Sequence, residues 1–284
     1  MIPRERLAAT LKLRKIELLP HSYDVIGDIA VLRVSDMIEN RGREVAEAVM
    51  QNNKHVKTVL RQVSPVSSSL RLRALSWVAG EKRTETVHKE HGCLFKVDVA
   101  RCYFSPRLLY ERRRIAQQVG PDEVVVNLFS GVGSYSVMIA RHSGARRVYS
   151  IDVNPVAIEY QAENVRLNGV ESVVEVILGD AASIVKARLL NIADRVLMPL
   201  PEKAFEYLDY AIMALRPGEG WVHYYDSVRA SRDEKPVEKV EDKVSRKMAD
   251  LGLDFEVSFG RVVRKVGPRR FQVVLDMLVR KESL

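Results

Sequence analysis

The stretch VVVNLFSGVGSYSVMIA, residues 124–140, decides the fold of this chain. Its residues are apolar almost throughout as far as Phe129, which predicts a strand buried on both faces, and a helix is predicted from the turn to Arg141. Gly131 and Gly133 stand in the turn, where the missing Cβ lets a ligand approach the backbone closely. The stretch therefore predicts a strand, a tight turn and a helix whose first N–H groups face a ligand.

Strands and helices continue to alternate after this turn. Further strands are predicted over residues 147–151, 173–178, 195–198 and 220–225. The helices predicted between them span residues 155–167, 181–190 and 203–215. A charged helix and an antiparallel hairpin complete the pattern, over about 234–251, 255–263 and 271–279. Strands that alternate with helices form parallel sheets, so we expect an α/β fold with a Rossmann-like doubly wound sheet.

The first hundred residues have a different pattern, in which strands dominate. Strands are predicted over residues 22–34 with a turn at Gly27-Asp28, over 56–60, and twice over 84–99 around His91-Gly92. The other elements are an amphipathic helix or arm over 1–20, a helix over 41–52 and a loop over 64–69. We therefore expect two domains, a smaller N-terminal α+β domain over residues 1–105 and a doubly wound domain over 106–284.

The composition points to an acidic partner. The 284 residues include 45 Lys and Arg against 37 Asp and Glu, which gives a formal net charge of +8. Arginines cluster at Arg112–Arg114, Arg146–Arg147 and Arg269–Arg270. Because such clusters neutralise phosphates, we expect a nucleic acid as the partner and the smaller domain to face RNA.

Other features exclude several classes of protein. No apolar run reaches the roughly 20 residues that span a bilayer, and the first twenty residues lack the apolar core of a secretory signal. The two cysteines, Cys93 and Cys102, fit neither a zinc spacing nor a disulfide framework. We therefore expect a cytoplasmic monomer with reduced thiols, without a metal and without a membrane partner.

Residues at the ends of the next two strands indicate an adenosine-type ligand. Asp152 ends the second strand, 19 residues after Gly133, where a carboxylate can accept both hydroxyls of a ribose. Asp180 ends the third strand, in a position to meet the adenine amino group. A dinucleotide-binding turn would need glycine where Ser136 stands, and no phosphate-binding Lys follows. We therefore expect the phosphate-free S-adenosyl-L-methionine, with a nicotinamide cofactor of an oxidoreductase as the alternative.

Pro199 and Pro201 follow the fourth predicted strand. In doubly wound sheets the substrate meets the cofactor at such carboxyl ends. The prolines stiffen the loop, remove N–H donors and leave carbonyl groups as acceptors. They are candidates for the substrate site, although a strand that simply terminates at proline has the same sequence.

Several stretches in this order resemble one family. They are VDVARCYFSPRLLYERRRIA (97–116), residues 124–140, IDVNPVAIEYQAENVRLNG (151–169), DRVLMPLPEKAFEYLD (194–209) and WVHYYD (221–226). The chain resembles the archaeal and eukaryotic tRNA (guanine-37-N1)-methyltransferase family, kin to the wybutosine aminocarboxypropyl transferases, over roughly residues 70–280. The resemblance implies a class I methyltransferase fold, S-adenosyl-L-methionine as cofactor and the tRNA anticodon stem-loop as partner.

The resemblance also implies roles for single residues. Glu111 is expected to be the general base, Tyr103 an aromatic residue at the cofactor and base pocket, and Arg71, or else Arg73, the contact to the guanine oxygen. The residues expected to act in catalysis are Glu111, Arg71, Pro199 and Pro201. Those expected to contact the cofactor are Tyr103, Arg112, Phe129, Ser130, Gly131, Gly133, Asp152, Val153, Asp180, Ala181 and Pro199. Without the resemblance, Tyr103 would be ordinary core and Glu111 a partner of Arg107 or Arg114 on a solvated helix.

Two departures from the family leave the methyl acceptor open. Members that act on N1 of guanosine carry Asn-Leu-Pro where this chain has Pro199, and usually Asp where it has Asn127. Proline at this place resembles the archaeal subgroup linked to wyosine synthesis, which methylates C7 of 4-demethylwyosine. The expected activity is therefore methylation of N1 of guanosine-37, with C7 methylation of 4-demethylwyosine as the alternative, alone or in addition. A non-catalytic RNA-binding module is the alternative outside enzymes.

Overall fold

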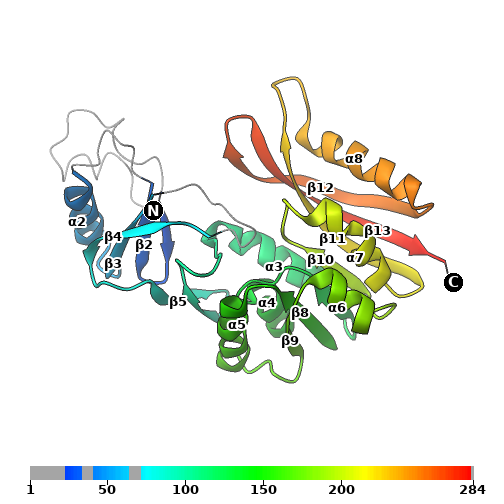
Figure 1. Ribbon diagram of the computed structural model, residues 1–284, viewed down its shortest axis with the longest axis horizontal. Helices are drawn as coiled ribbons and strands as arrows, with labels where there is room; N and C mark the ends of the chain where they lie inside the picture. Colours follow the sequence, from blue (N-terminus) through cyan, green and yellow to red (C-terminus); the bar gives the residue numbers. More distant parts are fainter. Residues whose placement is uncertain (1–22, 34–40, 64–71, 283–284) are drawn as a thin grey trace. The chain divides into compact units, whose positions relative to one another are not determined.

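The computed structural model describes residues 23–33, 41–63 and 72–282 (Figure 1). By the contacts among its residues the chain divides into two compact units, residues 1–110 and 111–284. The predicted helix or arm over residues 1–20, the predicted loop over 64–69 and Arg71 lie outside the described residues.

The first unit contains a four-stranded sheet and a hairpin. The sheet has the order β1 (Asp24–Ile26), β2 (Ile29–Leu32), β3 (Thr58–Gln62) and β4 (Leu75–Gly80), and the hairpin joins β5 (Glu85–Glu90) to β6 (Cys93–Asp98). The helix α2 (Gly42–Asn52) buries Val45, Ala48 and Val49 against this sheet. The predicted turn at Gly27-Asp28, the helix and the hairpin around His91-Gly92 are confirmed. Strand β4 was not predicted.

The turn at Gly27 shows how closely β1 and β2 approach the hairpin. Gly27 has a φ of +55°, and a Cβ there would lie 2.2 Å from Oγ1 of Thr86 on β5. The N–H of Gly27 donates to Nδ1 of His88, 3.0 Å away. A glycine is therefore required here both for the backbone angle and for the contact with β5.

The second unit is a seven-stranded sheet with helices on its faces. Its strands are β7 (Val124–Asn127), β8 (Arg147–Asp152), β9 (Val174–Leu178), β10 (Arg195–Met198), β11 (Gly218–Arg229), β12 (Asp254–Gly267) and β13 (Arg270–Lys281). Its helices are α3 (Leu109–Gln118), α4 (Ser134–His142), α5 (Pro155–Leu167), α6 (Ala181–Arg188), α7 (Ala204–Ala214) and α8 (Pro236–Asp250). A short helical turn, η3 (Pro106–Leu108), precedes α3.

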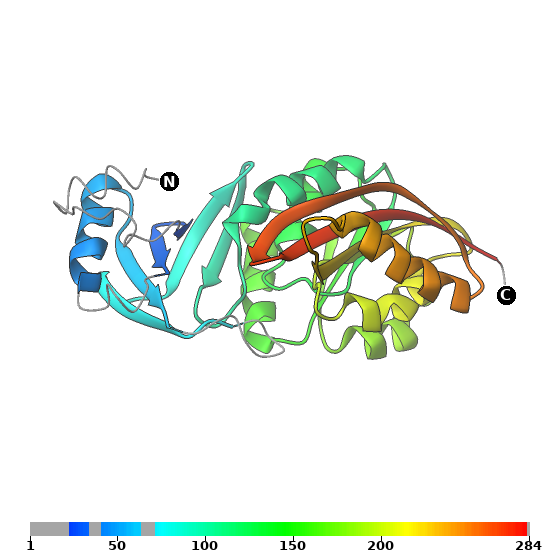
Figure 2. The same ribbon diagram turned by 90° about the horizontal axis from the view of Figure 1, so that it is seen from above.

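The strand order is β12-β13-β11-β10-β7-β8-β9. The strands from β9 to β11 are parallel to one another, whereas β12 and β13 form an antiparallel hairpin beside β11 (Figure 2). The chain runs outward from β7 through β8 to β9 and then returns to place β10 on the other side of β7. The carboxyl ends of β7 and β10 therefore form the switch point at which ligands bind in doubly wound sheets.

The expected α/β fold is confirmed, but the last three strands are longer than predicted. Strand β11 extends to Arg229 because it pairs with β13 over its whole length, from Gly218 opposite Lys281 to Arg229 opposite Arg270. The polar ends of these strands are held by ladder hydrogen bonds, which leave no apolar pattern in the sequence. Helix α8 covers the sheet with Val240, Val244 and Met248, which lie four residues apart on one helix face.

Shortening Leu208, which is fully buried in α7, should destabilise the second unit. We expect Leu208→Ala to lower the free energy of unfolding by about 2–5 kcal/mol, because it leaves a cavity in the core. The matched control is Leu167→Ala on α5, where the side chain is 45% exposed and the loss should be below about 0.5 kcal/mol. Urea unfolding should be followed by Trp221 fluorescence in a Trp77→Phe background. Equal losses for the two variants would contradict the packing of α7.

Candidate active site

The turn between β7 and α4 is tied to the end of β8. Gly131 and Gly133 have φ angles of +56° and +82°, which side chains rarely adopt. A Cβ on Gly133 would lie 2.8 Å from the Gln161 side chain, so this position has no room for another residue. The N–H of Gly131 donates to Oδ2 of Asp152 at 2.6 Å. The turn and the carboxylate predicted to bind a ribose are therefore neighbours.

Polar side chains under this turn bind one another. The Asn127 amide donates to Oγ of Ser136 at 3.1 Å, and its carbonyl oxygen accepts the N–H of Phe129. Ser136 also lies 2.5 Å from Oγ of Ser150, and all three polar side chains are buried. Asn127 is therefore part of the hydrogen-bonded support beneath the turn. Ser130 donates to Gln161 and thereby holds the first residue of the turn.

Asp152 and Val153 combine a carboxylate with an exposed apolar surface. Burial raises the pKa of Asp152, and the backbone N–H groups of Asn154 and Gly131 offset part of that rise. The backbone N–H of Val153 bonds to this carboxylate as well. The Val153 side chain is 49% exposed directly beside it. A ribose on Asp152 would bring its base against Val153.

Asp180 caps helix α6 and also contacts an aromatic residue that the sequence did not reveal. Its Oδ2 accepts the N–H of Ser183, and its Oδ1 accepts the hydroxyl of Tyr207 at 2.5 Å. Burial would raise the pKa of Asp180, but these donors outweigh it and lower the pKa. The ring of Tyr207 meets Phe129 edge to face, 5.1 Å between centroids. Tyr207 lies on an apolar helix face, so nothing in its sequence context marked it. Ala181, the first residue of α6, is buried.

The two prolines leave the sheet at the switch point. Met198, the last residue of β10, pairs with Tyr224 of β11, and Leu197 pairs with Asn127 of β7. Pro199 is therefore level with the start of the turn that contains Gly131 and Gly133. Pro199 is half-buried, whereas Pro201 is buried.

Glu111 is buried on α3 and surrounded by donors. Its Oε1 accepts from Nη2 of Arg114 at 2.6 Å and from the hydroxyl of Tyr225 at 2.8 Å. Its Oε2 accepts from Nη2 of Arg261 at 2.5 Å. Burial alone would raise the pKa of Glu111, but Arg114, Arg261 and Tyr225 outweigh it and hold the pKa below 4.5. Glu111 does pair with Arg114, but on a buried face and not on a solvated one.

A further chain of buried groups holds Arg114 in place. The Arg114 guanidinium pairs with Asp276 of β13, and Asp276 accepts from Nδ1 of His223 at 2.7 Å. Nε2 of His223 lies 2.7 Å from Nη1 of Arg195. A guanidinium only donates, so Nε2 accepts and the ring is neutral, in keeping with burial, which lowers the pKa of His223. In the sequence, the one residue that could have indicated these buried contacts is Asp276, a lone acid within the apolar run VVLDMLV.

Tyr225 links Glu111 to the helix that follows the Gly131–Gly133 turn. Its hydroxyl lies 3.4 Å from that of Tyr135, and the two rings meet at 66° with centroids 6.3 Å apart. Tyr135 is the second residue of α4, directly after the turn at Gly133. The Glu111 carboxylate therefore lies at the same edge of the sheet as the turn. Arg112, its neighbour on α3, is buried.

The remaining expected residues belong to the first unit. Arg73 is buried and pairs with Asp24, 3.4 Å away. The other carboxylate oxygen of Asp24 accepts from Arg107 at 2.7 Å. The charge of Arg73 is thus matched within its own unit. Tyr103 is half-buried in the same unit, and Arg71 lies outside the described residues.

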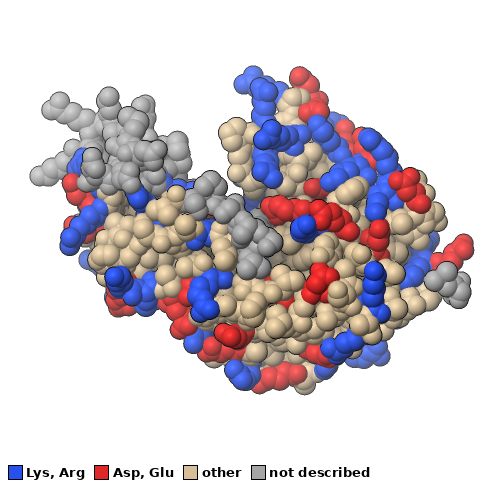
Figure 3. Space-filling model, in the orientation of Figure 1, with Lys and Arg blue, Asp and Glu red and all other residues tan. Residues whose placement is uncertain are grey.

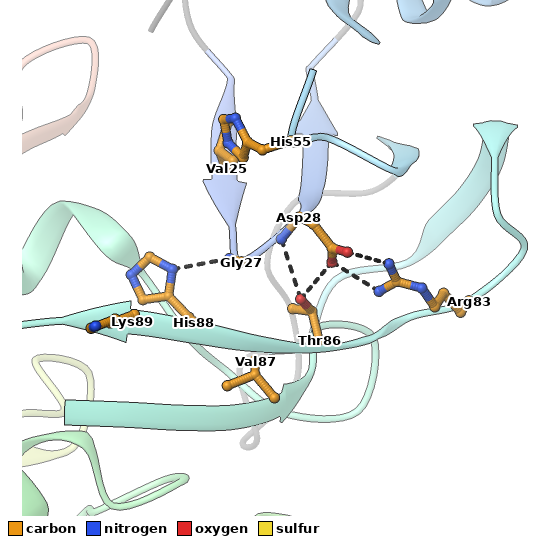
Figure 4. A pocket seen from close by; sticks show the side chains of 9 residues that line it. All are labelled: Val25, Gly27, Asp28, His55, Arg83, Thr86, Val87, His88 and Lys89. Carbon is orange, nitrogen blue, oxygen red and sulfur yellow. Dashed lines mark hydrogen bonds and ion pairs between the residues drawn. The ribbon is translucent and has the colours of Figure 1, made fainter. Parts of the chain in front are cut away.

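The first unit also has an open depression of about 680 Å³ (Figure 4). Its polar groups bond mainly to one another. Arg83 donates to both oxygens of Asp28, at 2.9 and 2.5 Å, and Thr86 donates to the same carboxylate. His55 and Lys89 also line it. It is a polar junction between the β1–β2 turn and β5. None of the residues expected to act in catalysis or to contact the cofactor line it.

The described residues contain neither a long apolar helix nor a cluster of metal-ligating side chains. No helix within residues 23–33, 41–63 and 72–282 is long and apolar enough to cross a membrane. In the same ranges, no three His, Cys, Asp or Glu side chains are grouped so that they could hold a metal ion.

The sequence of this chain is similar to that of characterised enzymes. The tRNA (guanine(37)-N(1))-methyltransferase Trm5b of Pyrococcus abyssi is 37% identical over 277 residues, which cover 97% of this chain and 79% of that protein. The tRNA 4-demethylwyosine(37)-methyltransferase Taw21 of Saccharolobus solfataricus is 35% identical over 89% of this chain and 92% of that protein.

Solved structures share the fold. A complex of aTrm5 with tRNALeu has a TM-score of 0.83 at 34% identity and covers 99% of this chain and 80% of that one. Pyrococcus horikoshii TYW2 in complex with MeSAdo has a TM-score of 0.81 at 29% identity, over 99% and 100% of the two chains.

Family models match both parts of the sequence. Residues 86–251 match the TRM5/TYW2 methyltransferase domain, and residues 3–84 match the TYW2 N-terminal domain. The methyltransferase match covers more than half of the chain and contains Glu111, the glycine turn and both prolines. This chain therefore belongs to the TRM5/TYW2 methyltransferase family.

Proposed function

We propose that this chain transfers a methyl group from S-adenosyl-L-methionine to N1 of guanosine at position 37 of tRNA, in the anticodon loop. The main support for this proposal is the Glu111 carboxylate, which is buried and ionised. It lies at the same sheet edge as the Gly131–Gly133 turn and Asp152. A proton acceptor beside a nucleoside site is what transfer to a ring nitrogen requires.

The side chains at the turn fit S-adenosyl-L-methionine. Asp152 offers acceptors for ribose hydroxyls, Val153 an apolar surface for adenine, and Asp180 an acceptor for the adenine amino group. The buried Ser136 occupies the place where a pyrophosphate-binding turn needs glycine, which argues against a nicotinamide cofactor. When bound, S-adenosyl-L-methionine supplies an electrophilic methyl group on its sulfonium.

The residues of this chain would then act on the guanine. The base must leave its stack to reach the pocket, as anticodon-loop nucleotides can. Pro199 and Pro201 give the strand end a fixed shape, so that N1 is held in line with the methyl group. Glu111 takes the proton that N1 loses. Because Tyr225 and Arg114 fix the carboxylate, no reorganisation is needed at the moment of transfer.

The basic surface supports tRNA as the partner. Lys and Arg side chains are numerous over α8, β12 and β13 in Figure 3, with Asp and Glu among them. The fold is shared with an enzyme solved on tRNALeu. We propose that residues 1–105 face the RNA, that residues 106–284 hold the cofactor, and that the protein acts as a monomer. Cys93 and Cys102 are thiols and not a disulfide, and together with a tRNA substrate this favours the cytoplasm.

A second acceptor, C7 of 4-demethylwyosine, is supported by Pro199. The residue that replaces the family's Asn has no side-chain amide to hold the guanine edge, and Taw21 is among the relatives. In that reaction carbon is the nucleophile, and a proton leaves after attack. Glu111 would serve as its acceptor too.

Incubation with two tRNAs separates the acceptors. Methyl-labelled cofactor should be supplied with tRNA that carries guanosine-37 and, separately, with tRNA that carries 4-demethylwyosine-37. We expect 1-methylguanosine at position 37 of the first tRNA by nucleoside mass analysis. Label only on the second tRNA would reject the leading proposal and support the alternative, and label on neither would reject both.

Replacing the proposed base should stop turnover without loss of the cofactor. We expect Glu111→Gln to lower kcat by about 10²–10⁴-fold, because the amide cannot take the N1 proton. The affinity for S-adenosylhomocysteine should stay unchanged. The control is Glu159→Gln, at an exposed residue on α5, which should keep both the affinity and kcat. In the unaltered protein Arg114, Arg261 and Tyr225 lower the pKa of Glu111, so activity should persist to a lower pH than an ordinary glutamate would allow. Full turnover by Glu111→Gln at saturating tRNA would remove this assignment.

Removing the carboxylate of Asp152 should weaken cofactor binding. A hydrogen bond to a charged group contributes about 1.5–3 kcal/mol, so Asp152→Asn should bind S-adenosylhomocysteine about 10–150-fold more weakly in calorimetric titration. The control is Asp122→Asn, an exposed position with a φ of 61° that Asn tolerates. Unchanged affinity, or binding of NADH in its place, would overturn the proposed cofactor site.

A further inference from the structure

We propose that the turn between β12 and β13, together with the end of β11 beside it, binds backbone phosphates of the anticodon stem-loop next to nucleotide 37. This inference rests on the proposed function, because it takes tRNA as the partner, and it goes further by naming a surface that holds the RNA. It is carried by the charge of the turn, by its backbone and by its place at the sheet edge.

The hairpin is strongly basic around its turn. From Val257 to Leu275 the sequence contains no acid and five cations, Arg261, Arg264, Lys265, Arg269 and Arg270. Arg261 binds Glu111, and Arg264 bonds to Gln272. The other three side chains are exposed, and among the described residues no carboxylate forms an ion pair with any of them. Their charges are therefore available to an anion from outside the unit.

A further cation stands directly opposite the turn. Arg229, the last residue of β11, pairs with Arg270 across the antiparallel ladder, and both side chains are exposed. Like charges opposite each other destabilise a sheet. Arg270 donates to the hydroxyl of Ser227 at 3.0 Å, which leaves its charge unbalanced. The adjoining loop over residues 230–235 does not balance it, because its two acids are matched by two cations.

The backbone of the turn favours a residue other than the one it has. Pro268 and Arg269 alone connect β12 to β13, and Arg269 has a φ of +54°. Proline followed by a positive φ is the pattern of a type II turn, which takes Gly or Asn at the second position. Strained positions of this kind cluster where a protein binds ligands, and the group that the strain presents here is a guanidinium.

The turn stands beyond the sheet edge that carries the site. Strand β11 is parallel to β10, and β10 to β7, so the end of β11 lies past their carboxyl ends. Tyr225 of β11 bonds to Glu111, and Arg229 is four residues further on, about 13 Å along the strand. Figure 2 shows the turn at the end of the hairpin away from the C-terminus. RNA that delivers a base to Glu111 approaches this edge, where the turn can meet the neighbouring phosphates.

The chemistry of the turn suits phosphates and not bases. Exposed Lys and Arg side chains that neutralise phosphates release condensed counterions, so the binding is strong at low salt and weak at high salt. Such contacts position the RNA without reading its sequence. The turn would thus hold the stem-loop while the site beneath it acts on the base.

The test is binding of the whole chain to tRNA with guanosine-37, measured by fluorescence anisotropy over a range of salt concentrations. Each phosphate contact contributes about 0.7–0.9 to the slope of log K against log salt. The double variant Arg269→Asn/Arg270→Gln should therefore flatten the slope by about 1.4–1.8 and weaken binding about 10–100-fold at 0.1 M salt. In methylation assays the loss should appear in the KM for tRNA.

The matched control removes two cations from the opposite edge of the sheet. Arg216 pairs with Asp194, and Arg280 pairs with Glu219, both at the amino end of β11. Arg216→Gln/Arg280→Gln lowers the net charge by the same amount and should leave the salt slope unchanged. An equal effect of the two double variants would show that net charge alone is at work and would overturn the inference.

A single variant separates binding from folding. Asn tolerates a positive φ, so Arg269→Asn should keep or raise the melting temperature while it weakens tRNA binding. Its affinity for S-adenosylhomocysteine should match that of the unaltered protein. A lower melting temperature together with weaker binding of both ligands would show that Arg269 supports the fold, and would overturn the inference.

The choice of RNA supplies the last check. The loss should persist on the isolated anticodon stem-loop and should be equal with guanosine and adenosine at position 37, because phosphates carry no base information. Unchanged tRNA affinity and slope, or a loss that is absent on the stem-loop, would overturn the inference. Unchanged tRNA affinity with lost binding to vesicles of anionic lipid would assign the turn to a membrane surface instead. The proposed function is tested separately, by methylation of guanosine-37 by the unaltered protein.

Discussion

The burial of the Glu111 carboxylate is the constraint on which the catalytic unit depends. An isolated charge inside a protein is very costly, so the charges around Glu111 are paired with charges of opposite sign. The anions Glu111, Asp276 and Glu123 alternate with the cations Arg261, Arg114 and Arg195, and neutral His223 joins the two halves. Three charges of each sign balance. Removal of one member leaves an uncompensated charge, at a cost of about 3–5 kcal/mol.

Much of the fold could be predicted, because its signals are local. The alternation from Val124 onward, the glycine turn and the carboxylate of Asp152 each occupy a short window of sequence, and the structure has them at one edge of the sheet. The environment of Glu111 could not be predicted. Its partners Arg261 and Asp276 come from strands far along the chain, and no periodicity indicates which buried polar groups will meet. Tyr207 was missed for the same reason.

The two departures from the family, at positions 127 and 199, lie in different parts of the site. Asn127 donates to Ser136 and accepts from Phe129, and both contacts lie beneath the turn. It therefore belongs to the support of the turn. Pro199 stands at the switch point with its side chain half-buried, where a change of residue alters the end of β10.

The hairpin of β12 and β13 has a consequence for how the protein is made. Glu111 lies at the start of the second unit, yet 150 residues separate it from Arg261, and 162 separate Arg114 from Asp276. Protein domains begin to fold during synthesis, from the N-terminal side. The glycine turn can thus form on a nascent chain before the carboxylate meets Arg261. The set of charges around Glu111 is complete only after residues 254–281 have emerged from the ribosome, which delays the chemistry of the protein until translation of the hairpin is complete.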